Sequence, residues 1–282
     1  MSRSATLLAL AAIVLWASLA LLSVQLRAVP PFLLVAIALL VGAACGLPRW
    51  REWKVPPTTL LLGCYGLFGY HFCLFMAFRF APALEANLIN YLWPLLIVLL
   101  SPLILPGVSL TPRHIAGGLL GFAGCGLIVA GQGLALPESR HLLGYGLALM
   151  AAVMWSTYSL LTKRVRAFPT GAIGGFCAAS GVLALLAHCL FEPAYWPLPA
   201  EWGWLLWLGV GPMGAAFFLW DAALKRGDAR AIGTLAYLTP LLSTALLALF
   251  GGGSFGWRAA VAMGLILGGA WLGNSSRRGD PR

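Results

Sequence analysis

Charged side chains are scarce in this sequence. Asp, Glu, Lys and Arg together make up 9% of the 282 residues, against about 25% in soluble globular domains. Hydrophobic residues make up 61%. This composition argues against an ordinary soluble domain and is typical of a protein surrounded by lipid. We therefore predict an all-α integral membrane protein whose apolar runs cross the bilayer as helices.

Acidic residues are especially few. Eight Asp and Glu stand against 18 Lys and Arg, which gives a net charge of +10. In a soluble chain such an excess would suggest nucleic acid as a partner. Here the basic residues lie in the short breaks between apolar runs, where Lys and Arg act as topology signals. We therefore expect the lipid bilayer as the surroundings and no nucleic-acid partner.

Motifs for metal binding and ATP binding are also missing. The six cysteines lie inside apolar runs and form no C-x-x-C pair, so we expect neither disulfides nor metal ligands. The sequence has no Asp-rich stretch, no H-E-x-x-H and no nucleotide-binding P-loop. We predict no enzyme activity, no catalytic residue, no metal site and no cofactor.

What the sequence does contain is a series of apolar runs, each long enough or nearly long enough to cross a bilayer. We predict ten membrane-spanning helices with short loops between them. Their approximate ranges are 5–24, 31–47, 59–78, 86–105, 115–134, 142–161, 171–191, 202–224, 231–250 and 257–273. The first range resembles a signal peptide, but the return of its pattern later in the chain favours a retained helix.

The basic residues are divided unequally between the two sets of loops that ten spans create. One side holds fourteen of them: Arg3, Arg49, Arg51, Lys54, Arg113, Lys163, Arg164, Arg166, Lys225, Arg226, Arg230, Arg277, Arg278 and Arg282. The other side holds four: Arg27, Arg79, Arg140 and Arg258. Because cytoplasmic loops carry the excess of Lys and Arg, we predict that both termini are cytoplasmic.

The chain contains an internal repeat. A shift of 139 residues aligns Trp16 with Trp155. A shift of 146 residues aligns Gly63, Tyr91 and Pro94 with Gly209, Tyr237 and Pro240. We therefore predict two five-helix halves, 1–136 and 137–282. Because five is odd, the second half is inverted relative to the first, as in many secondary transporters that work by alternating access around a central cavity.

A polar stretch opens the fourth apolar run. Asn87, Asn90, Tyr91 and Pro94 are spaced i, i+3, i+4 and i+7, so they share one face of a helix, and Trp93 flanks them. Proline leaves a carbonyl of the preceding turn without its helical donor, which hydrocarbon tolerates only where protein, water or a ligand satisfies it. The stretch predicts either a packing kink or a bend beside a substrate cavity.

The pattern Tyr-x-x-Pro-Leu-Leu returns at 237–242, and this repetition favours the bend. We predict that Pro94 and Pro240 mark matched bends that take part in gating. Gly63 and Gly209 are predicted either to permit close helix packing or to serve as flexing points.

Two features together resemble the EamA-type transporters of the drug/metabolite transporter superfamily. One is the tryptophan in the opening span of each half, Trp16 and Trp155. The other is Tyr-x-x-Pro in the fourth span of each half. Within that superfamily, 91–94, 69–71 and 155–156 resemble a group of aromatic amino acid exporters. The resemblance covers nearly the whole chain. It implies a multi-pass protein of the bacterial inner membrane whose central cavity receives aromatic and other amino acids.

Aromatic and polar side chains in the middle of predicted spans are candidates for substrate binding. An ionisable residue such as His71 faces a cavity or bonds a neighbouring helix at that depth. The indole N–H of a central Trp needs a partner, which either a cavity or a main-chain carbonyl can provide. The predicted substrate-binding set is His71, Asn87, Asn90, Tyr91, Trp93, Trp155, Tyr158, Trp16 and Tyr237.

From these features we predict a monomeric secondary transporter that exports neutral amino acids, aromatic ones above all. Their rings would stack on aromatic side chains, and their polar ends would bond the Asn and His residues. Two alternatives stay open: an exporter of another small metabolite or lipophilic drug, and a channel. Asp221, four residues before Lys225, has the spacing of a local ion pair.

Overall fold

The computed structural model describes residues 2–130, 139–250 and 257–274. Within these ranges the chain forms helices and no β-strand. A helix satisfies its main-chain polar groups within the segment, which an apolar run in lipid requires. The predicted boundary between the two halves, at 136–137, lies outside the described residues, as do Arg277, Arg278 and Arg282.

Within the described residues, each of the ten predicted ranges falls on one helix or on several helices in succession, and positions 131–134 of the fifth range lie outside them. In chain order the elements are α1 (Arg3–Ala17), α2 (Leu19–Gln25), α3 (Pro31–Gly46), η1 (Leu47–Trp53), α4 (Pro57–Cys64), η2 (Tyr65–Gly69), α5 (Tyr70–Phe80), α6 (Ala83–Asn90), α7 (Trp93–Ile104), α8 (Pro112–Ala130), η3 (Ser139–His141), α9 (Leu142–Leu161), α10 (Ala172–Phe191), α11 (Pro199–Val210), η4 (Gly211–Ala215), α12 (Ala216–Arg226), α13 (Ala229–Leu235), α14 (Leu238–Phe250) and α15 (Trp257–Asn274). η1 and η3 are 3-10 helices, whereas η2 and η4 are π-helical turns.

Seven helical segments in the described ranges are long and apolar enough to cross a membrane. They are Pro31–Trp53, Pro57–Phe80, Ala83–Ile104, Pro112–Ala130, Leu142–Leu161, Ala172–Phe191 and Pro199–Arg226. Two shorter apolar helices, Arg3–Ala17 and Ala260–Gly273, coincide with the first and tenth predicted ranges. The chain is therefore a membrane protein whose described part is all-helical, while the ten spans and their inverted repeat stay predictions.

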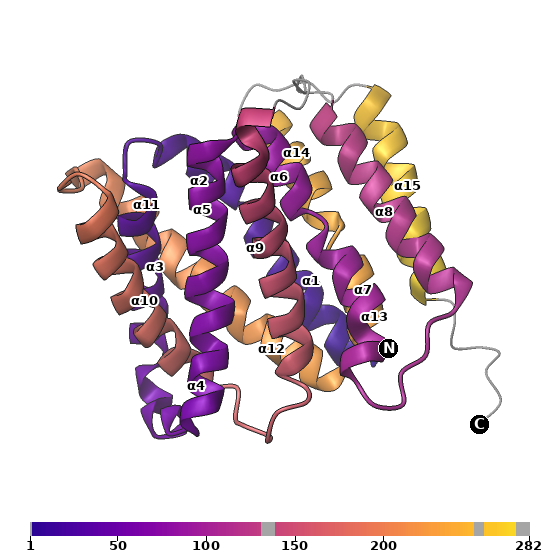
Figure 1. The fold of residues 1–282 in the computed structure, drawn as a ribbon, viewed down its shortest axis with the longest axis horizontal. Helices are drawn as coiled ribbons and strands as arrows, with labels where there is room; N and C mark the ends of the chain where they lie inside the picture. The colour runs from indigo at the N-terminus through magenta and orange to yellow at the C-terminus, as the bar shows by residue number, and fades with distance from the viewer. Residues whose placement is uncertain (1, 131–138, 251–256, 275–282) are drawn as a thin grey trace.

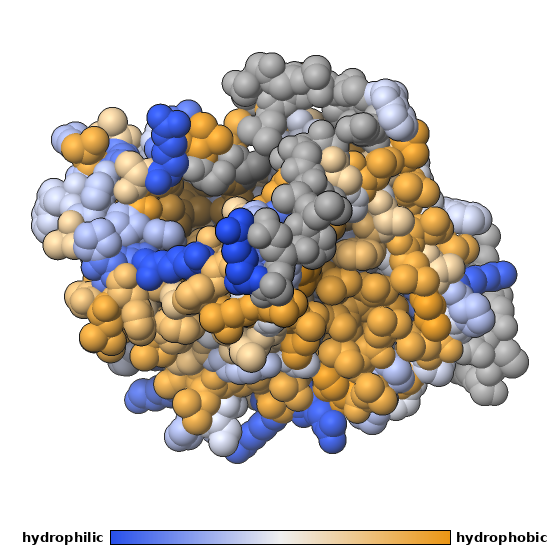
Figure 2. Space-filling view, turned by 45° about the horizontal axis from the view of Figure 1, so that its top comes forward, coloured by the Kyte–Doolittle hydropathy of each residue, from blue (hydrophilic) through white to orange (hydrophobic). Residues whose placement is uncertain are grey.

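The helices lie side by side in one bundle, with α8 and α15 together at one edge and α10 and α11 near the other (Figure 1). Hydrophobic residues cover much of the flank visible in Figure 2, and hydrophilic residues gather toward the two ends. Such a surface suits a bundle whose sides meet lipid and whose ends meet water.

Close packing between helices far apart in sequence holds the bundle together. α3 packs against α10, α8 against α15, α1 against α12, and α5 against α9. At the α8–α15 contact, a Cβ added to Gly117 would lie 2.7 Å from the carbonyl oxygen of Gly269. A Cβ on Gly269 would lie 2.6 Å from the carbonyl oxygen of Gly117. Small residues of this kind let membrane helices approach each other closely.

Carboxylates cap the α3–α10 pair at opposite ends. Glu192, directly after α10, accepts hydrogen bonds from the main-chain N–H groups of Phe32 (2.9 Å) and Leu33 (3.2 Å) in the first turn of α3. Glu52, in η1 after α3, accepts one from the N–H of Gly171, directly before α10 (3.0 Å). A carboxylate at a helix N-terminus satisfies free N–H donors and complements the helix dipole. Each helix of the pair is therefore capped by the segment that follows the other.

The fourth and ninth predicted ranges differ from the expected continuous helices with bends at proline. The helix breaks at Tyr91–Leu92 between α6 and α7, and at Ala236–Tyr237 between α13 and α14. Pro94 and Pro240 consequently lie in the first turns of α7 and α14, where the missing N–H costs no helical hydrogen bond. The two breaks come two and three residues before the prolines.

Candidate functional site

Four tryptophans from four helices meet in the interior of the bundle. Trp16 comes from α1, Trp93 from α7, Trp155 from α9 and Trp220 from α12, and none is more than 8% exposed. The ring centroid of Trp16 lies 6.3 Å from that of Trp93, 5.8 Å from Trp155 and 5.1 Å from Trp220. These separations are those of interacting aromatic pairs. We call these four residues the tryptophan cluster.

Polar side chains from α5 and α6 adjoin the tryptophan cluster. The ring centroid of Tyr70 lies 5.3 Å from that of Trp155 and 4.8 Å from that of His71. Asn90 Nδ2 donates a hydrogen bond to the Tyr70 hydroxyl oxygen (3.3 Å). His71 Nδ1 bonds the Leu67 carbonyl of its own helical segment. The structure therefore joins two predicted site residues, His71 and Asn90, to the cluster through Tyr70.

The indole N–H groups in the cluster have protein partners at two positions. Trp16 Nε1 donates to the carbonyl oxygen of Pro212, in the π-helical turn η4 (3.0 Å). Trp220 Nε1 donates to Ser159 Oγ (3.1 Å). Of the two partners considered for Trp16, the structure shows the main-chain carbonyl. A π-helical turn alters the local hydrogen-bond ladder, and such turns are frequent at functional sites.

Tyr158 joins the cluster from α9. Its ring centroid lies 5.4 Å from that of Trp155, and its side chain is 3% exposed. A Cβ added to Gly66, in the π-helical turn η2, would lie 2.2 Å from Tyr158 Cγ. The glycine is thus what allows the tyrosine ring to lie directly on the backbone of η2.

Gly63 and Gly209 are both packed against neighbouring helices. A Cβ on Gly63 would lie 2.3 Å from Phe176 Cγ of α10, and one on Gly209 would lie 2.5 Å from Val41 Cβ of α3. Close packing, one of their two predicted roles, is therefore what the structure displays. Each glycine lies two residues before a π-helical turn, and a flexing role stays a prediction.

Tyr237 lies apart from the tryptophan cluster. It is fully buried in a separate apolar group with Leu95 of α7, Cys125 of α8 and Ile266 of α15. A Cβ added to Gly121 would lie 2.3 Å from Tyr237 Cδ2. Tyr91 packs against the same group, and both it and Asn87 are half-buried. The structure therefore places Tyr237 near Tyr91, in a group separate from the tryptophan cluster.

Sequence reasoning missed three residues of this region: Tyr70, Phe217 and Trp220. The Phe217 ring centroid lies 5.6 Å from that of Trp155 and 6.3 Å from that of His71. Trp220 has no counterpart in the internal repeat, since a shift of 146 residues pairs it with Leu74. One feature of the sequence could have identified Trp220 as a candidate. It lies inside a predicted span, away from the membrane interface where Trp concentrates.

Figure 2 shows the surface hollowed at the end of the bundle that is uppermost in Figure 1, with a hydrophobic floor where it is visible. Within the described part of the chain, no group of three or more His, Cys, Asp and Glu side chains is placed to hold a metal ion. The interior combines aromatic surface with a few neutral polar groups, an arrangement suited to an organic solute that carries an apolar part.

The chain resembles known transporters along nearly its whole length. The model of the EamA-like transporter family matches residues 3–130 and 142–275. The aromatic amino acid exporter YddG of Ancylobacter novellus is 45% identical over 282 residues, which span 96% of this chain and 97% of that protein. The protein of the same name from Escherichia coli is 28% identical, and the match spans 87% of this chain and 88% of that one. A solved crystal structure superposes with a TM-score of 0.93 at 43% identity and covers 98% of this chain and 100% of that chain.

Proposed function

Because the chain belongs to the EamA-like transporter family, we propose that it exports neutral amino acids, aromatic ones preferentially, by alternating access. Family membership and the apolar helices make it a multi-pass inner-membrane transporter of a small molecule, and not an enzyme. The proposal adds the substrate, the direction and the mechanism. Its first support is the name shared by the matched relatives, aromatic amino acid exporter.

The observation that carries the proposal is the tryptophan cluster. Trp16 and Trp93 belong to the first predicted half, and Trp155 and Trp220 to the second, so the rings meet where the two halves meet. Inverted-repeat transporters place their substrate sites at that interface, near the bilayer midplane. Aromatic rings there provide stacking surfaces for an aromatic substrate, and Asn90 and His71 provide neutral polar partners.

Several features support the inverted repeat. The π-helical turns Tyr65–Gly69 and Gly211–Ala215 are 146 residues apart, the same shift that aligns Gly63 with Gly209. If each helix is replaced by its counterpart in the other predicted half, the contact between α1 and α12 becomes the contact between α9 and α5. The contacts between α3 and α10 and between α8 and α15 map onto themselves. The same replacement exchanges the cap that Glu192 provides for α3 with the cap that Glu52 provides for α10.

Transport by the purified protein tests the proposed substrate class. Liposomes that carry only this protein should accumulate or release labelled phenylalanine and tryptophan with saturation, faster than labelled nucleosides. Saturation would favour a carrier, whereas single-channel currents would favour a pore. Nucleoside flux without amino acid flux would assign the protein to the alternative, export of another small metabolite.

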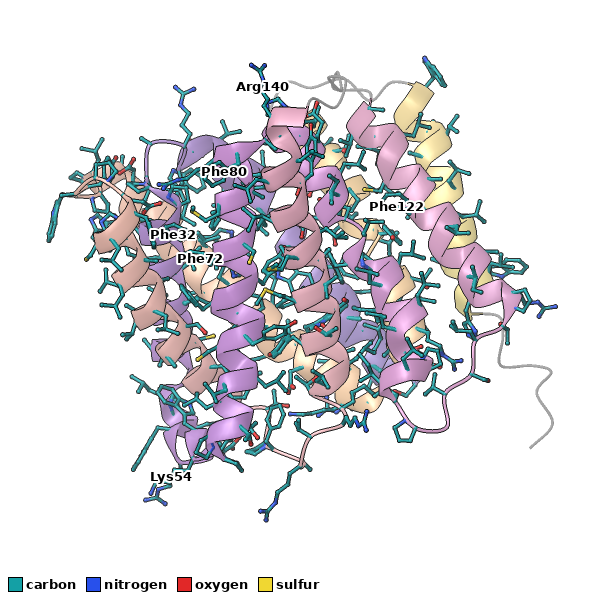
Figure 3. All side chains as sticks on the ribbon, viewed as in Figure 1. Phe32, Lys54, Phe72, Phe80, Phe122 and Arg140 are labelled. Carbon is teal, nitrogen blue, oxygen red and sulfur yellow. The ribbon has the colours of Figure 1, made fainter. Side chains whose placement is uncertain are left out.

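The predicted topology places residues near Arg51 and Arg164 at the cytoplasmic face and residues near Arg140 and Glu192 at the outer face. Figure 3 shows Lys54 and Arg140 at opposite ends of the bundle, as this topology requires. Ala194 is exposed, whereas the side chain of the nearby Glu192 is 1% exposed and a poor position for labelling. Single cysteines are placed at 51, 140 and the exposed positions 166 and 194, in a chain without the native six. They should react with an impermeant thiol reagent in whole cells only at 140 and 194. Labelling at 51 and 166 instead would reverse the orientation.

The gating role of the prolines predicts that Pro94→Ala and Pro240→Ala slow transport with little loss of stability. Each proline lies in the first turn after a helix break. There it stiffens the backbone and is expected to contribute only about 0.4–1 kcal/mol to stability. Flux divided by the amount of folded protein is the measurement. Equal flux per folded molecule in the wild type and both variants would show that the prolines only shape the packing.

A further inference from the structure

A second recess lies away from the tryptophan cluster, where the ends of α7, α9, α12 and α13 meet. Its volume is about 350 Å³, within the range of roughly 300–1,000 Å³ that small-molecule pockets occupy. Ser101, Lys163, Lys225, Arg226, Asp228 and Arg230 are among the residues that line it. The predicted topology assigns it to the cytoplasmic face. We call it the Lys163 pocket.

Two of the cations around this pocket are paired with carboxylates. Arg230 Nη2 lies 2.6 Å from Asp228 Oδ2, and Arg230 Nε donates to Asp228 Oδ1 (3.0 Å). Lys225 Nζ lies 2.7 Å from Asp221 Oδ2, which confirms the ion pair expected from their spacing. Because Lys225 and Arg230 are paired with carboxylates, the excess positive charge of the pocket comes from Lys163 and Arg226.

Lys163 differs from the other cations in its partners. Its ammonium donates hydrogen bonds to the carbonyl oxygens of Gly227 (2.8 Å) and Leu224 at the C-terminal end of α12. Burial lowers the pKa of the Lys163 ammonium, and the negative charge of Asp228 opposes that shift. A cation at a helix C-terminus is favoured by the free carbonyls and the helix dipole. In this state Lys163 fastens the end of α9 to the end of α12.

A carboxylate is a stronger acceptor for an ammonium than a carbonyl is, because the hydrogen bond is then assisted by both charges. An amino acid substrate carries such a carboxylate. The tryptophan cluster offers an aromatic surface to the ring of the substrate. No Lys or Arg of the described residues stacks on the tryptophans of the cluster. The four rings of the tryptophan cluster are uncharged, so they supply no cation for the carboxylate of the substrate.

We propose that the Lys163 pocket receives the α-carboxylate of an amino acid at the cytoplasmic face, and that Lys163 exchanges its two carbonyl partners for that carboxylate. The proposal rests on the proposed amino acid export. The exchange would break the two hydrogen bonds by which Lys163 joins the end of α9 to the end of α12, so that substrate arrival and loosening of this end occur together. Lys163 thereby acts as the residue that selects solutes with a carboxylate.

The test compares phenylalanine with phenethylamine, which keeps the ring and the amine but lacks the carboxylate. In liposomes without anionic lipid, Lys163→Gln should raise the half-saturating concentration of phenylalanine about threefold to fivefold, as expected for a partly exposed ion pair. Inhibition by phenethylamine should not change. Lys163→Arg should restore most of the phenylalanine affinity. Arg166→Gln is the matched control, because it removes one charge from an exposed position in the same loop.

If Lys163→Gln weakened phenylalanine transport and phenethylamine inhibition equally, Lys163 would be only structural. If it changed neither, Lys163 would not contact the substrate. Either result would overturn the proposal. An effect that appears only with phosphatidylglycerol in the liposomes would assign the pocket to a lipid headgroup and overturn it as well. Absence of amino acid flux in the wild type would instead reject the proposed function.

A second measurement decides the matter if Lys163→Gln fails to fold. An amine-acylating reagent should modify Lys163 of the wild-type protein, and mass spectrometry can follow the rate at that residue. Both solutes are amines that also consume the reagent, so the rate at Lys163 is expressed relative to that at the exposed Lys54 of the same sample. Phenylalanine should slow this relative rate more than phenethylamine does at equal occupancy of the transporter. Equal protection by both solutes would contradict carboxylate recognition at Lys163.

Discussion

Replacing Glu192 with Ala should lower the free energy of unfolding in detergent by about 3–5 kcal/mol, the range for breaking a buried charged network. The Glu192 side chain is 1% exposed. It accepts from the N–H groups of Phe32 and Leu33, bonds His188 Nδ1 (2.9 Å) and lies 3.9 Å from Arg79 Nη2. The substitution removes all of these partners together and leaves the first turn of α3 uncapped.

Chemical unfolding of the purified protein is the measurement, and Glu52→Ala is the comparison. Glu52 is half-buried and accepts from one N–H group, that of Gly171, so its loss should cost only about 1 kcal/mol, as for a single helix cap. Glu192→Gln, which keeps an acceptor oxygen, should fall between the wild type and Glu192→Ala. If Glu52→Ala proved as damaging as Glu192→Ala, the charge network at the α10 end would not be the cause.

Replacing Trp155 with Ala should reduce the affinity for phenylalanine or tryptophan about threefold to tenfold more than that for a small neutral amino acid. Stacking contributes roughly 0.5–1.5 kcal/mol per aromatic pair beyond area burial, and 1.4 kcal/mol is a factor of about ten. Trp155 is 4% exposed and its ring contacts Trp16, Trp93 and Tyr70. It is thus surrounded by the aromatic surface that an aromatic substrate would meet.

Because a buried Trp→Ala change also costs about 3–5 kcal/mol of stability, transport has to be expressed per folded molecule. Trp155→Phe keeps a ring and should keep most of the aromatic preference. His71→Ala removes a polar partner and should weaken transport of aromatic and small amino acids alike. An unchanged preference in Trp155→Ala at normal membrane expression would show that the substrate ring does not meet Trp155.

The positions of most helices could be predicted from the sequence. The predicted range 142–161 coincides with α9, and 171–191 differs from α10 by one residue at its start. Apolar runs in lipid have to become helices, so a one-dimensional measure of hydrophobicity suffices to find them. Hydrophobicity along the chain could not reveal the helix breaks at Tyr91–Leu92 and Ala236–Tyr237, because an apolar run continues through each of them.

The membership of the site was only partly predictable. Trp16, Trp93 and Trp155 were identified from their central places in predicted spans, and the structure brings them together. Tyr237 was selected because it repeats Tyr91, but its ring lies in the group formed by α7, α8, α14 and α15. The repeat pairs positions of the sequence between the two predicted halves, whereas the neighbours of each side chain depend on residues that differ between them, such as Thr239 in place of Trp93.

The sequence by itself determined that this chain is a helical membrane protein with few charges inside its spans, since each of these properties follows from composition along the chain. Only the tertiary structure decided which side chains meet. Trp220 joined the tryptophan cluster and Lys163 reached the carbonyls at the end of α12 because helices distant in sequence cross at those points. Such contacts depend on helix rotation and crossing, which close packing of small residues sets and which hydrophobicity alone leaves open.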